Sequence, residues 1–351
     1  MSLQFKKPKL NRIHNKKNAP FDSHFYLDLQ IKAIKDRIKT NQAKRVYIEF
    51  GGKIFDDLHA SRVLPGYFPD MKFRIIKKLF NDSDIIFVVS AEDILRKRIR
   101  GDHKITYDLE SLRMLNGMQK KGVFIKNVVI TRMPTNGSIP KEIKNFKISL
   151  EKNNREVSFL KEGVDHTNPN KDWFSYDNND HILTKKKYVI ILSPGGGSGK
   201  FGVCINQLYH EMRNGIVPFY IKFETFPVHD LPVIHPVNLA YMAASADFYD
   251  LVMKDPRKKN ASSYNRDVEN YELLHNLARY FKESGSLLKN INSATNMGVN
   301  VVSKSVINWE DVEKEAAAEV GRRLIRHKYE VQNGQEKIEV LERIRKIITF
   351  L

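Results

Sequence analysis

The chain has 351 residues, of which 41% are hydrophobic and 28% charged, and this composition is typical of a globular protein and excludes wholesale disorder. Its single cysteine, Cys204, excludes an intrachain disulfide and any metal site with several cysteine ligands, and it favours a reducing, cytoplasmic location. No apolar run reaches the roughly 18 residues of a membrane span, and the first residues lack the apolar core of a signal peptide. We therefore expect neither a membrane partner nor export.

The chain is strongly basic. Lys and Arg number 59 against 41 Asp and Glu, a net charge of +18, and residues 1–45 alone hold twelve basic and three acidic side chains. An arm that follows nucleic-acid phosphates would carry such charge. A flexible leader over residues 1–20, followed by a polar helix face, would carry it too. We favour the leader, because no helix-turn-helix, zinc-finger or aromatic RNA-binding signature accompanies the charge. Nucleic acid stays an alternative partner.

The first half of the chain alternates between helical and strand patterns. Apolar strands are predicted at 45–50, 84–90 and 123–131, and helices at 24–40, 71–80 and 107–121. The second strand is a continuous run rich in Ile and Val, which is typical of a strand buried on both faces. Strands and helices that alternate at this spacing predict a parallel sheet built from residues 21–135.

The second half repeats this pattern after an interruption. Residues 136–186, rich in Pro, Gly, Asn and Asp, are predicted to form an irregular insertion. A second α/β half over 187–260 follows, with strands at 187–193 and 216–223, and the helices of this part of the chain are predicted at 198–214, 236–253, 265–283, 309–329 and 337–351. We therefore predict an α/β fold with a doubly wound, mostly parallel, Rossmann-like sheet, followed by a helical region over 261–351. The last helix is apolar and must dock on this chain or on a partner, and we expect a homo-oligomer.

The most informative motif is a glycine-rich turn, Ser193-Pro194-Gly195-Gly196-Gly197-Ser198-Gly199-Lys200, between a strand and an amphipathic helix. Glycines let backbone N–H groups converge on an anion, the helix N-terminus adds its unpaired N–H groups, and Lys200 adds a full charge. The turn departs from the phosphate-loop pattern G-x-x-x-x-G-K-[ST]. Pro194 occupies the first glycine position, and Phe201 replaces the hydroxyl that binds magnesium. We predict a phosphate- or nucleotide-binding turn made of Gly195, Gly196, Gly197, Ser198, Gly199 and Lys200; a tight turn with a solvent-facing lysine is the structural alternative.

Polar side chains also follow two other predicted strands. Because the carboxyl ends of parallel strands share one edge of a sheet, Lys53 and Lys200 are expected to face one cleft. Candidate catalytic or metal-binding groups at this edge are Lys53, Asp56, Asp57, His59 and Glu224. Arg62 and Arg266 are candidate phosphate-binding cations. A capped helix start is the structural alternative for 56–59, as is an ion pair for Arg266, and Cys204 is expected to pack on the sheet.

Several runs of the sequence closely resemble the bacterial domain-of-unknown-function family 1846. They include YIEFGGKIFDDLHASRVLPGYFPD, RGDHKITYD, SPGGGSGK and YIKFETFPVHDLPVIHPVNLAYMAASAD, and the resemblance runs from about residue 21 to about residue 320. It implies that the two lysine-bearing glycine turns belong to one ancestral design, but the family has no established activity. The family turn reads G-P-G-S-G-K, and Gly196 stands here where the family has Pro. Family members continue into a further α/β domain, so the resemblance implies a chain that lacks it.

These observations predict a protein that binds a nucleotide or a small phosphorylated ligand, with magnesium and a nucleotide as candidate cofactors. Phosphoryl or nucleotidyl transfer is the reaction to test first, because such a site supplies positioning and charge neutralisation. A regulatory protein that binds the ligand without turnover is the alternative, which Phe201 and the missing domain favour.

Overall fold

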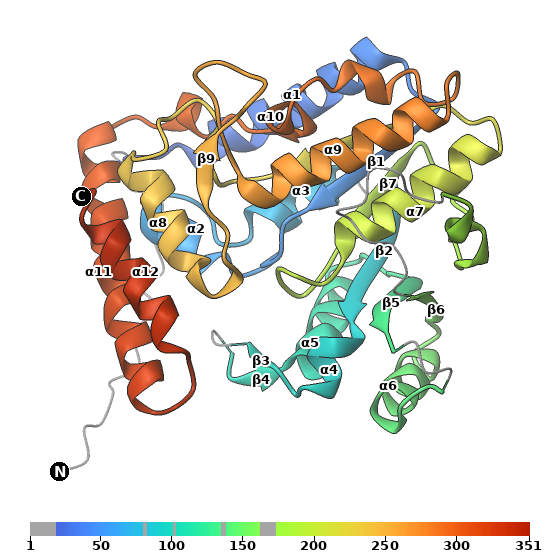
Figure 1. Ribbon diagram of the computed structural model, residues 1–351, viewed down its shortest axis with the longest axis horizontal. Helices are drawn as coiled ribbons and strands as arrows, with labels where there is room; N and C mark the ends of the chain where they lie inside the picture. Colours follow the sequence, from blue (N-terminus) through green and yellow to red (C-terminus); the bar gives the residue numbers. More distant parts are fainter. Residues whose placement is uncertain (1–18, 80–82, 101–102, 135–137, 162–172) are drawn as a thin grey trace.

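The computed structural model describes residues 19–79, 83–100, 103–134, 138–161 and 173–351. At its centre lies a seven-stranded sheet in the order β11-β8-β1-β7-β2-β5-β6, in which every neighbouring pair is parallel (Figure 1). The strands are β1 (Arg45–Phe50), β2 (Ser83–Ser90), β5 (Asn127–Met133), β6 (Glu156–Lys161), β7 (Tyr188–Leu192), β8 (Pro218–Phe223) and β11 (Gly298–Val299). The predicted α/β class is confirmed.

Helices cover both faces of this sheet, as successive residues of β8 show. Phe219 lies under Arg37 of α1 (Ser23–Asn41), whereas Tyr220 meets Phe201 of α7 (Lys200–Arg213) edge to face. α1 packs beside α3 (Met71–Leu79), and α7 packs beside α9 (Asn265–Tyr280). α5 (Tyr107–Lys120) packs against β2. Because neighbouring residues of a strand point to opposite faces, α1 and α7 lie on opposite sides of the sheet.

The strand order puts β7 between β1 and β2. From β1 the chain crosses to β2 and continues outward to β5 and β6, whereas from β7 it crosses to β8 and later reaches β11 on the other side. Neighbouring strands whose connections leave in opposite directions form a crevice at their carboxyl ends, where open α/β sheets bind ligands. The glycine-rich turn follows β7 and therefore stands at this switch point.

Short elements fill the connections between the strands and the long helices. They are α2 (Leu58–Val63), α4 (Ala91–Leu95), β3 (Ile99–Arg100), β4 (Ile105–Thr106), β9 (Val252–Lys254), β10 (Ser262–Tyr264) and α10 (Ala294–Met297), with 3-10 turns η2 (Trp173–Asn178), η3 (Ala246–Phe248), η4 (Leu288–Asn290) and η5 (Ser303–Ser305). Two of the pairs, β3 with β4 and β9 with β10, are antiparallel.

The segment 136–186, predicted to be an irregular insertion, contains one α-helix and one strand in its described part, whereas residues 179–186 are irregular as expected. α6 (Lys141–Glu151) buries Ile143, Phe146 and Leu150, and β6 forms one edge of the central sheet. β6 is only partly buried, so its sequence mixes polar and apolar residues and lacks the apolar run that marks a central strand. The boundaries proposed for the two α/β halves stay a prediction.

Two expected features of the last third also differ. The helix expected at 236–253 is shorter, α8 (Pro236–Ala244), because the chain then turns into η3 and pairs β9 with β10. The helical region expected over 261–351 also supplies β11, a two-residue strand at the sheet edge. A strand this short leaves no periodic pattern in the sequence.

The C-terminal helices α11 (Trp309–Gln332) and α12 (Ile338–Ile348) form an antiparallel hairpin at one side of the molecule (Figure 1). α12 buries Val340, Leu341, Ile344 and Ile347 and packs against α11 and α8. The apolar last helix therefore docks on this chain. Within the described ranges, every helix is too short or too polar to span a bilayer.

Candidate functional site

The glycine-rich turn leads directly into α7. Gly197 and Gly199 have φ angles of 74° and 83°, which favour glycine, and Gly199 is the N-cap of α7. No side chain of the residues that the structure describes caps the helix, so the amides of its first turn are left for solvent or a ligand. Thr131 at the end of β5 fixes the turn by donating to Ser198 O at 2.7 Å.

Lys200 is buried, and its ammonium points back into the turn. Nζ donates to Ser193 Oγ at 3.0 Å and to Gly195 O at 3.4 Å. None of the ion pairs among the described residues involves Lys200, and burial lowers its pKa. The neutral oxygens of the turn itself thus hold this cation, and the structural alternative of a solvent-facing lysine is wrong. An incoming anion would compete only with these weak hydrogen-bond partners.

The structure brings the two glycine turns into contact. A Cβ atom on Gly52 would lie 2.8 Å from Gly195 Cα, and one on Gly195 would lie 2.7 Å from the Tyr107 hydroxyl. A side chain at either position would clash with these neighbours. Close packing therefore requires glycine at both positions, in addition to the proposed binding of a ligand. Lys53 follows this contact directly and has a φ of 64°.

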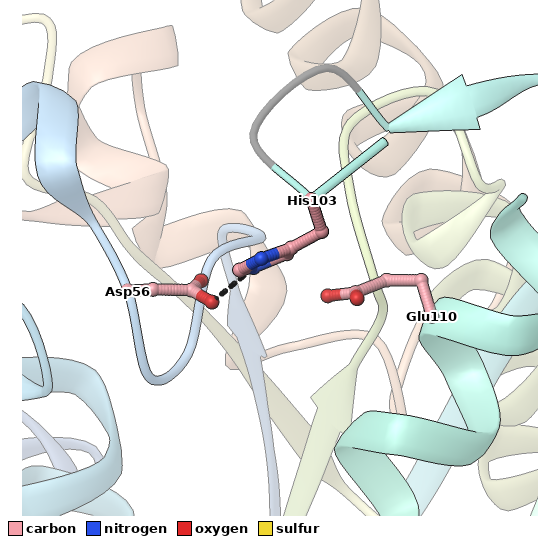
Figure 2. A group of neighbouring side chains, drawn as sticks. All are labelled: Asp56, His103 and Glu110. Carbon is pink, nitrogen blue, oxygen red and sulfur yellow. Dashed lines mark hydrogen bonds and ion pairs between the residues drawn. The ribbon is translucent and has the colours of Figure 1, made fainter. Parts of the chain in front are cut away.

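Asp56 lies in a cluster of charged side chains that the sequence did not reveal (Figure 2). His103 Nε2 lies 2.5 Å from Asp56 Oδ2, and Arg100 Nη2 lies 2.9 Å from Asp56 Oδ1. Arg113 donates both to Asp56 and to Glu110 of α5, and Arg100 also pairs with Glu110. Figure 2 shows the Asp56 and Glu110 carboxylates approaching the His103 ring from opposite sides.

This cluster contains residue types that bind metal ions, but it lacks the net negative charge that would attract a cation. Asp56, His103 and Glu110 offer ligand atoms within 4.8 Å of one another. However, two arginines already neutralise the two carboxylates, and a cation would have to displace them.

Asp57 and His59 take part in the local structure of α2. Asp57 caps the helix by accepting from Ala60 N at 3.2 Å, and it pairs with Lys72 at 2.8 Å. Burial opposes its ionisation, but the charges of Lys72 and Lys53 prevail and lower its pKa. His59 Nδ1 lies 3.2 Å from Glu319 of α11. Burial lowers the pKa of His59 to about 4, so the ring is neutral at pH 7.

Arg62 also binds Glu319 rather than lying open to a ligand. The guanidinium reaches both carboxylate oxygens, at 2.7 and 2.9 Å, and Arg322 and Arg323 of α11 donate to the same carboxylate. Although burial opposes ionisation, the hydrogen bonds with His59 and Arg62 and the charge of Arg323 hold the pKa of Glu319 well below its usual range. The ion pairs of Glu319 therefore connect α2 to α11.

Glu224 belongs to a row of buried polar groups on the α7–α9 face of the sheet. Tyr220, Lys222 and Glu224 alternate along and just after β8, and Glu49 of β1 is the register partner of Lys222. Lys222 Nζ lies 2.6 Å from Glu224 Oε1, 2.5 Å from Asp267 Oδ1 and 2.6 Å from the Tyr264 hydroxyl. Tyr220 donates to Glu49 at 2.7 Å. A magnesium ion at Glu224 Oε1 would compete with Lys222.

The charges of this row do not balance when every group is ionised. Glu49, Glu224 and Asp267 are acidic, whereas Lys200 and Lys222 are basic, and each of the five is buried. Burial and the charge of Glu224 raise the pKa of Asp267 to about 8, while the charge of Lys222 and the hydrogen bond with His229 outweigh burial and lower that of Glu224 to about 2. A protonated Asp267 leaves two positive and two negative groups.

The two remaining residues have structural contacts. Arg266 pairs with Asp250 at 2.5 Å, so its ion-pair alternative is present. Cys204 is fully buried, as expected, and burial raises its pKa well above the usual range.

Sequence reasoning missed Arg100, His103 and Lys222. A lysine in the middle of an apolar strand was a usable signal for Lys222, because parallel strands are normally apolar on both faces. Arg100 and His103 gave no such signal, since they stand among other charged residues of short connections.

Sequence comparisons agree on one family. The family model described as "Domain of unknown function DUF1846, N-terminal" matches residues 19–350. A "UPF0371 protein" of Streptococcus equi subsp. zooepidemicus (strain H70) is 38% identical over 320 residues, which are 88% of this chain and 61% of that protein. "UPF0371 protein M28_Spy1076" of Streptococcus pyogenes serotype M28 (strain MGAS6180) is 36% identical over 339 residues, 93% of this chain and 67% of that protein. The chain thus spans less than two thirds of the first relative, and neither name states an activity.

Proposed function

Since the chain belongs to the family described as domain of unknown function DUF1846, whose description gives no activity, we propose that it binds the phosphate of a nucleotide or phosphorylated metabolite at turn 195–200. The observation that carries the proposal is the position of this turn, at the switch point of the sheet and at an uncapped helix N-terminus. Helix amides and one ammonium group in such a place attract an oxyanion.

Lys200 supports the proposal because no ion pair among the described residues neutralises its buried ammonium group. A buried ammonium held by a hydroxyl and a carbonyl is desolvated and lacks a contacting countercharge among the described residues, since Glu49 acts on it only from a distance. A phosphate beside it would supply that charge and draw Nζ away from Gly195 O. Lys53 would add a second cation from the neighbouring turn.

Magnesium enters the proposal as an ion that arrives with a nucleotide. Phe201 offers no hydroxyl ligand, and Lys222 and Tyr264 already hold Glu224 Oε1. A ligand-binding protein without turnover is the second candidate, because the acids Asp57 and Glu224 are both paired with lysines. Phosphate-release assays with and without magnesium separate the two.

Three further expectations belong to the proposal: a cytoplasmic location, a homo-oligomer, and nucleic acid as a less favoured partner. Residues 1–18 of the basic leader lie outside the described residues. Deleting them should reduce the slope of log affinity for DNA against log salt if the leader binds phosphates, and an unchanged slope removes that option.

The test of the proposed site is titration calorimetry with ATP and with inorganic pyrophosphate. Lys200→Met keeps the buried aliphatic stem and removes the charge, and we expect at least a tenfold loss of affinity. Lys77→Met, at an exposed position of α3, is the matched control and should bind as the parent does. Equal binding by Lys200→Met and the parent contradicts the proposal.

A further inference from the structure

We propose that Asp56 and His103 form a carboxylate–imidazole pair that moves a proton during phosphoryl transfer from a phosphate ester or phosphoanhydride bound at turn 195–200. His103 is the catalytic residue and Asp56 is the positioning residue. The inference rests on the proposed phosphate binding, and it deepens it by assigning a reaction and the group that carries it.

The pair adjoins the turn through one guanidinium group. Arg100 is buried; its Nη2 lies 2.9 Å from Asp56 Oδ1, and its Nη1 donates to Pro194 O at 3.1 Å. Tyr107 follows His103 by four residues in the chain, and its hydroxyl lies against Gly195 of the turn. Gly52, four residues before Asp56, also touches Gly195. Asp56 is thus held next to the place where we expect the ligand's phosphate.

The contact with Asp56 decides which nitrogen of His103 is basic. An ionised carboxylate only accepts hydrogen bonds, so the Nε2 that lies 2.5 Å from Asp56 Oδ2 carries the hydrogen. Nδ1 then keeps its lone pair. Arg113 Nη2 lies 3.1 Å from the same Nε2 but cannot donate to a protonated nitrogen, and it donates instead to Asp56 and Glu110.

Accessibility favours His103 over His59, another histidine that pairs with a carboxylate. The His103 side chain is 27% exposed, whereas that of His59 is 7% exposed. A general base must reach the proton that it removes, directly or through one water. Solvent can reach His103, so a water could stand between its ring and the ligand, and Asp56 fixes the ring as carboxylates do in catalytic triads.

Charge balance favours proton transfer at this cluster over metal binding. Arg100, Arg113 and His103 donate to all four oxygens of Asp56 and Glu110. Two carboxylates and two guanidiniums cancel, which leaves Nδ1 of the imidazole as the atom of this cluster that can accept a proton.

The proposed step is hydrolysis or transfer of the terminal phosphoryl group. A water or hydroxyl oxygen attacks the phosphorus and gives its proton to His103 Nδ1. The bond from phosphorus to the bridging oxygen breaks, its electron pair stays on that oxygen, and His103 afterwards releases the proton to solvent. Nothing is oxidised or reduced, and Lys200 offsets the charge of the transferring oxygens.

The first test asks whether His103 faces the ligand. Diethyl pyrocarbonate modifies accessible imidazoles, and mass spectrometry of the full chain follows His103 with and without ATP. His24, exposed on α1, is the internal reference. We expect ATP to slow modification of His103 at least fivefold and to leave His24 unchanged. Equal modification of His103 in the presence of ATP that calorimetry shows to be bound overturns the assignment and leaves the proposed function standing.

The second test asks whether His103 does chemistry. We expect the parent to release phosphate from ATP, His103→Gln to lose 10²–10⁴-fold in kcat while its ATP affinity stays within about twofold, and Asp56→Asn to move the acid limb of the pH–rate profile to lower pH, because the imidazole loses its carboxylate neighbour. Lys120→Gln, exposed at the end of α5, is the control and keeps the parent rate. Release by His103→Gln at the parent rate, or ATP that binds the parent without release, overturns the assignment. ATP that does not bind at all overturns the proposed function with it.

Discussion

At the scale of single residues, His59 links solution pH to the stability of the fold. It is neutral in the folded protein, because burial lowers its pKa to about 4, whereas in the unfolded chain it titrates near 6.5. Between these values the unfolded state binds more protons, so the free energy of unfolding falls as the pH falls from about 6.5 to about 4. The full shift corresponds to about 3 kcal/mol.

His59→Gln removes this proton uptake. Urea unfolding of parent and variant at several pH values between 4 and 7 should give a shallower dependence on pH for the variant, by up to one proton. His24→Gln, at an exposed position of α1, is the control and should reproduce the parent slope. Parallel curves for His59→Gln and the parent would show that His59 is not the group that titrates.

The roles of single residues were only partly predictable from sequence. Gly-Lys after an apolar strand predicted the turn, because strand, turn and helix are contiguous in the chain. The partners of His59 were not predictable, since Glu319 lies 260 positions away. The partners of Asp56 were not predictable either, because its contacts with Arg100 and Arg113 depend on how separate segments of the chain pack around the turn.

At the scale of elements, β8 is unusual for a central parallel strand, because one of its faces is polar. Its row of charges requires the ammonium of Lys222 between Glu224 and Asp267. We expect Lys222→Met to destabilise the protein by about 3–5 kcal/mol, since it removes the positive charge beside the buried carboxylate of Glu224. Lys254→Met, at an exposed position of β9, should change the free energy of unfolding by less than about 0.5 kcal/mol.

Asp267→Asn tests whether Asp267, an acidic member of the same row, is protonated in the folded protein. The pKa of Asp267 is raised to about 8, so the folded protein holds a proton that the unfolded chain releases near pH 4. The parent therefore loses stability relative to the variant as the pH rises from about 4 to about 8, and the difference is constant above that range. Urea unfolding across this range measures it. A constant difference throughout would mean that Asp267 is ionised beside Lys222.

The central elements were predictable where burial repeats along the chain. Strands β1, β2, β7 and β8 are buried almost throughout, and their apolar runs gave their positions to within two residues. β6 and β11 were missed, because an edge strand needs no continuous apolar run and two residues make no pattern. Local sequence therefore predicts a strand best when both of its faces are covered.

At the scale of the whole molecule, the strand order was beyond sequence reasoning. The α/β alternation predicted a parallel sheet, but not that β7, about 140 residues after β1, enters between β1 and β2. Which strands become neighbours depends on long-range packing that leaves no trace in local periodicity. The switch point at the glycine-rich turn follows from this order.

The same order predicts that the two α/β halves are not independent domains. β1 pairs with β7 and β8 alone, and β2 needs β7 on one side, so a fragment of residues 19–135 lacks both partners of β1. We expect this fragment to be unfolded by circular dichroism and by amide exchange, because three strands without their central neighbours bury too little apolar surface. Coexpression with a fragment of residues 138–351 should restore a folded complex, since all seven strands are then present. A fragment 19–135 that unfolds cooperatively on its own would instead show that the first half is a domain and that β7 joins a preformed sheet.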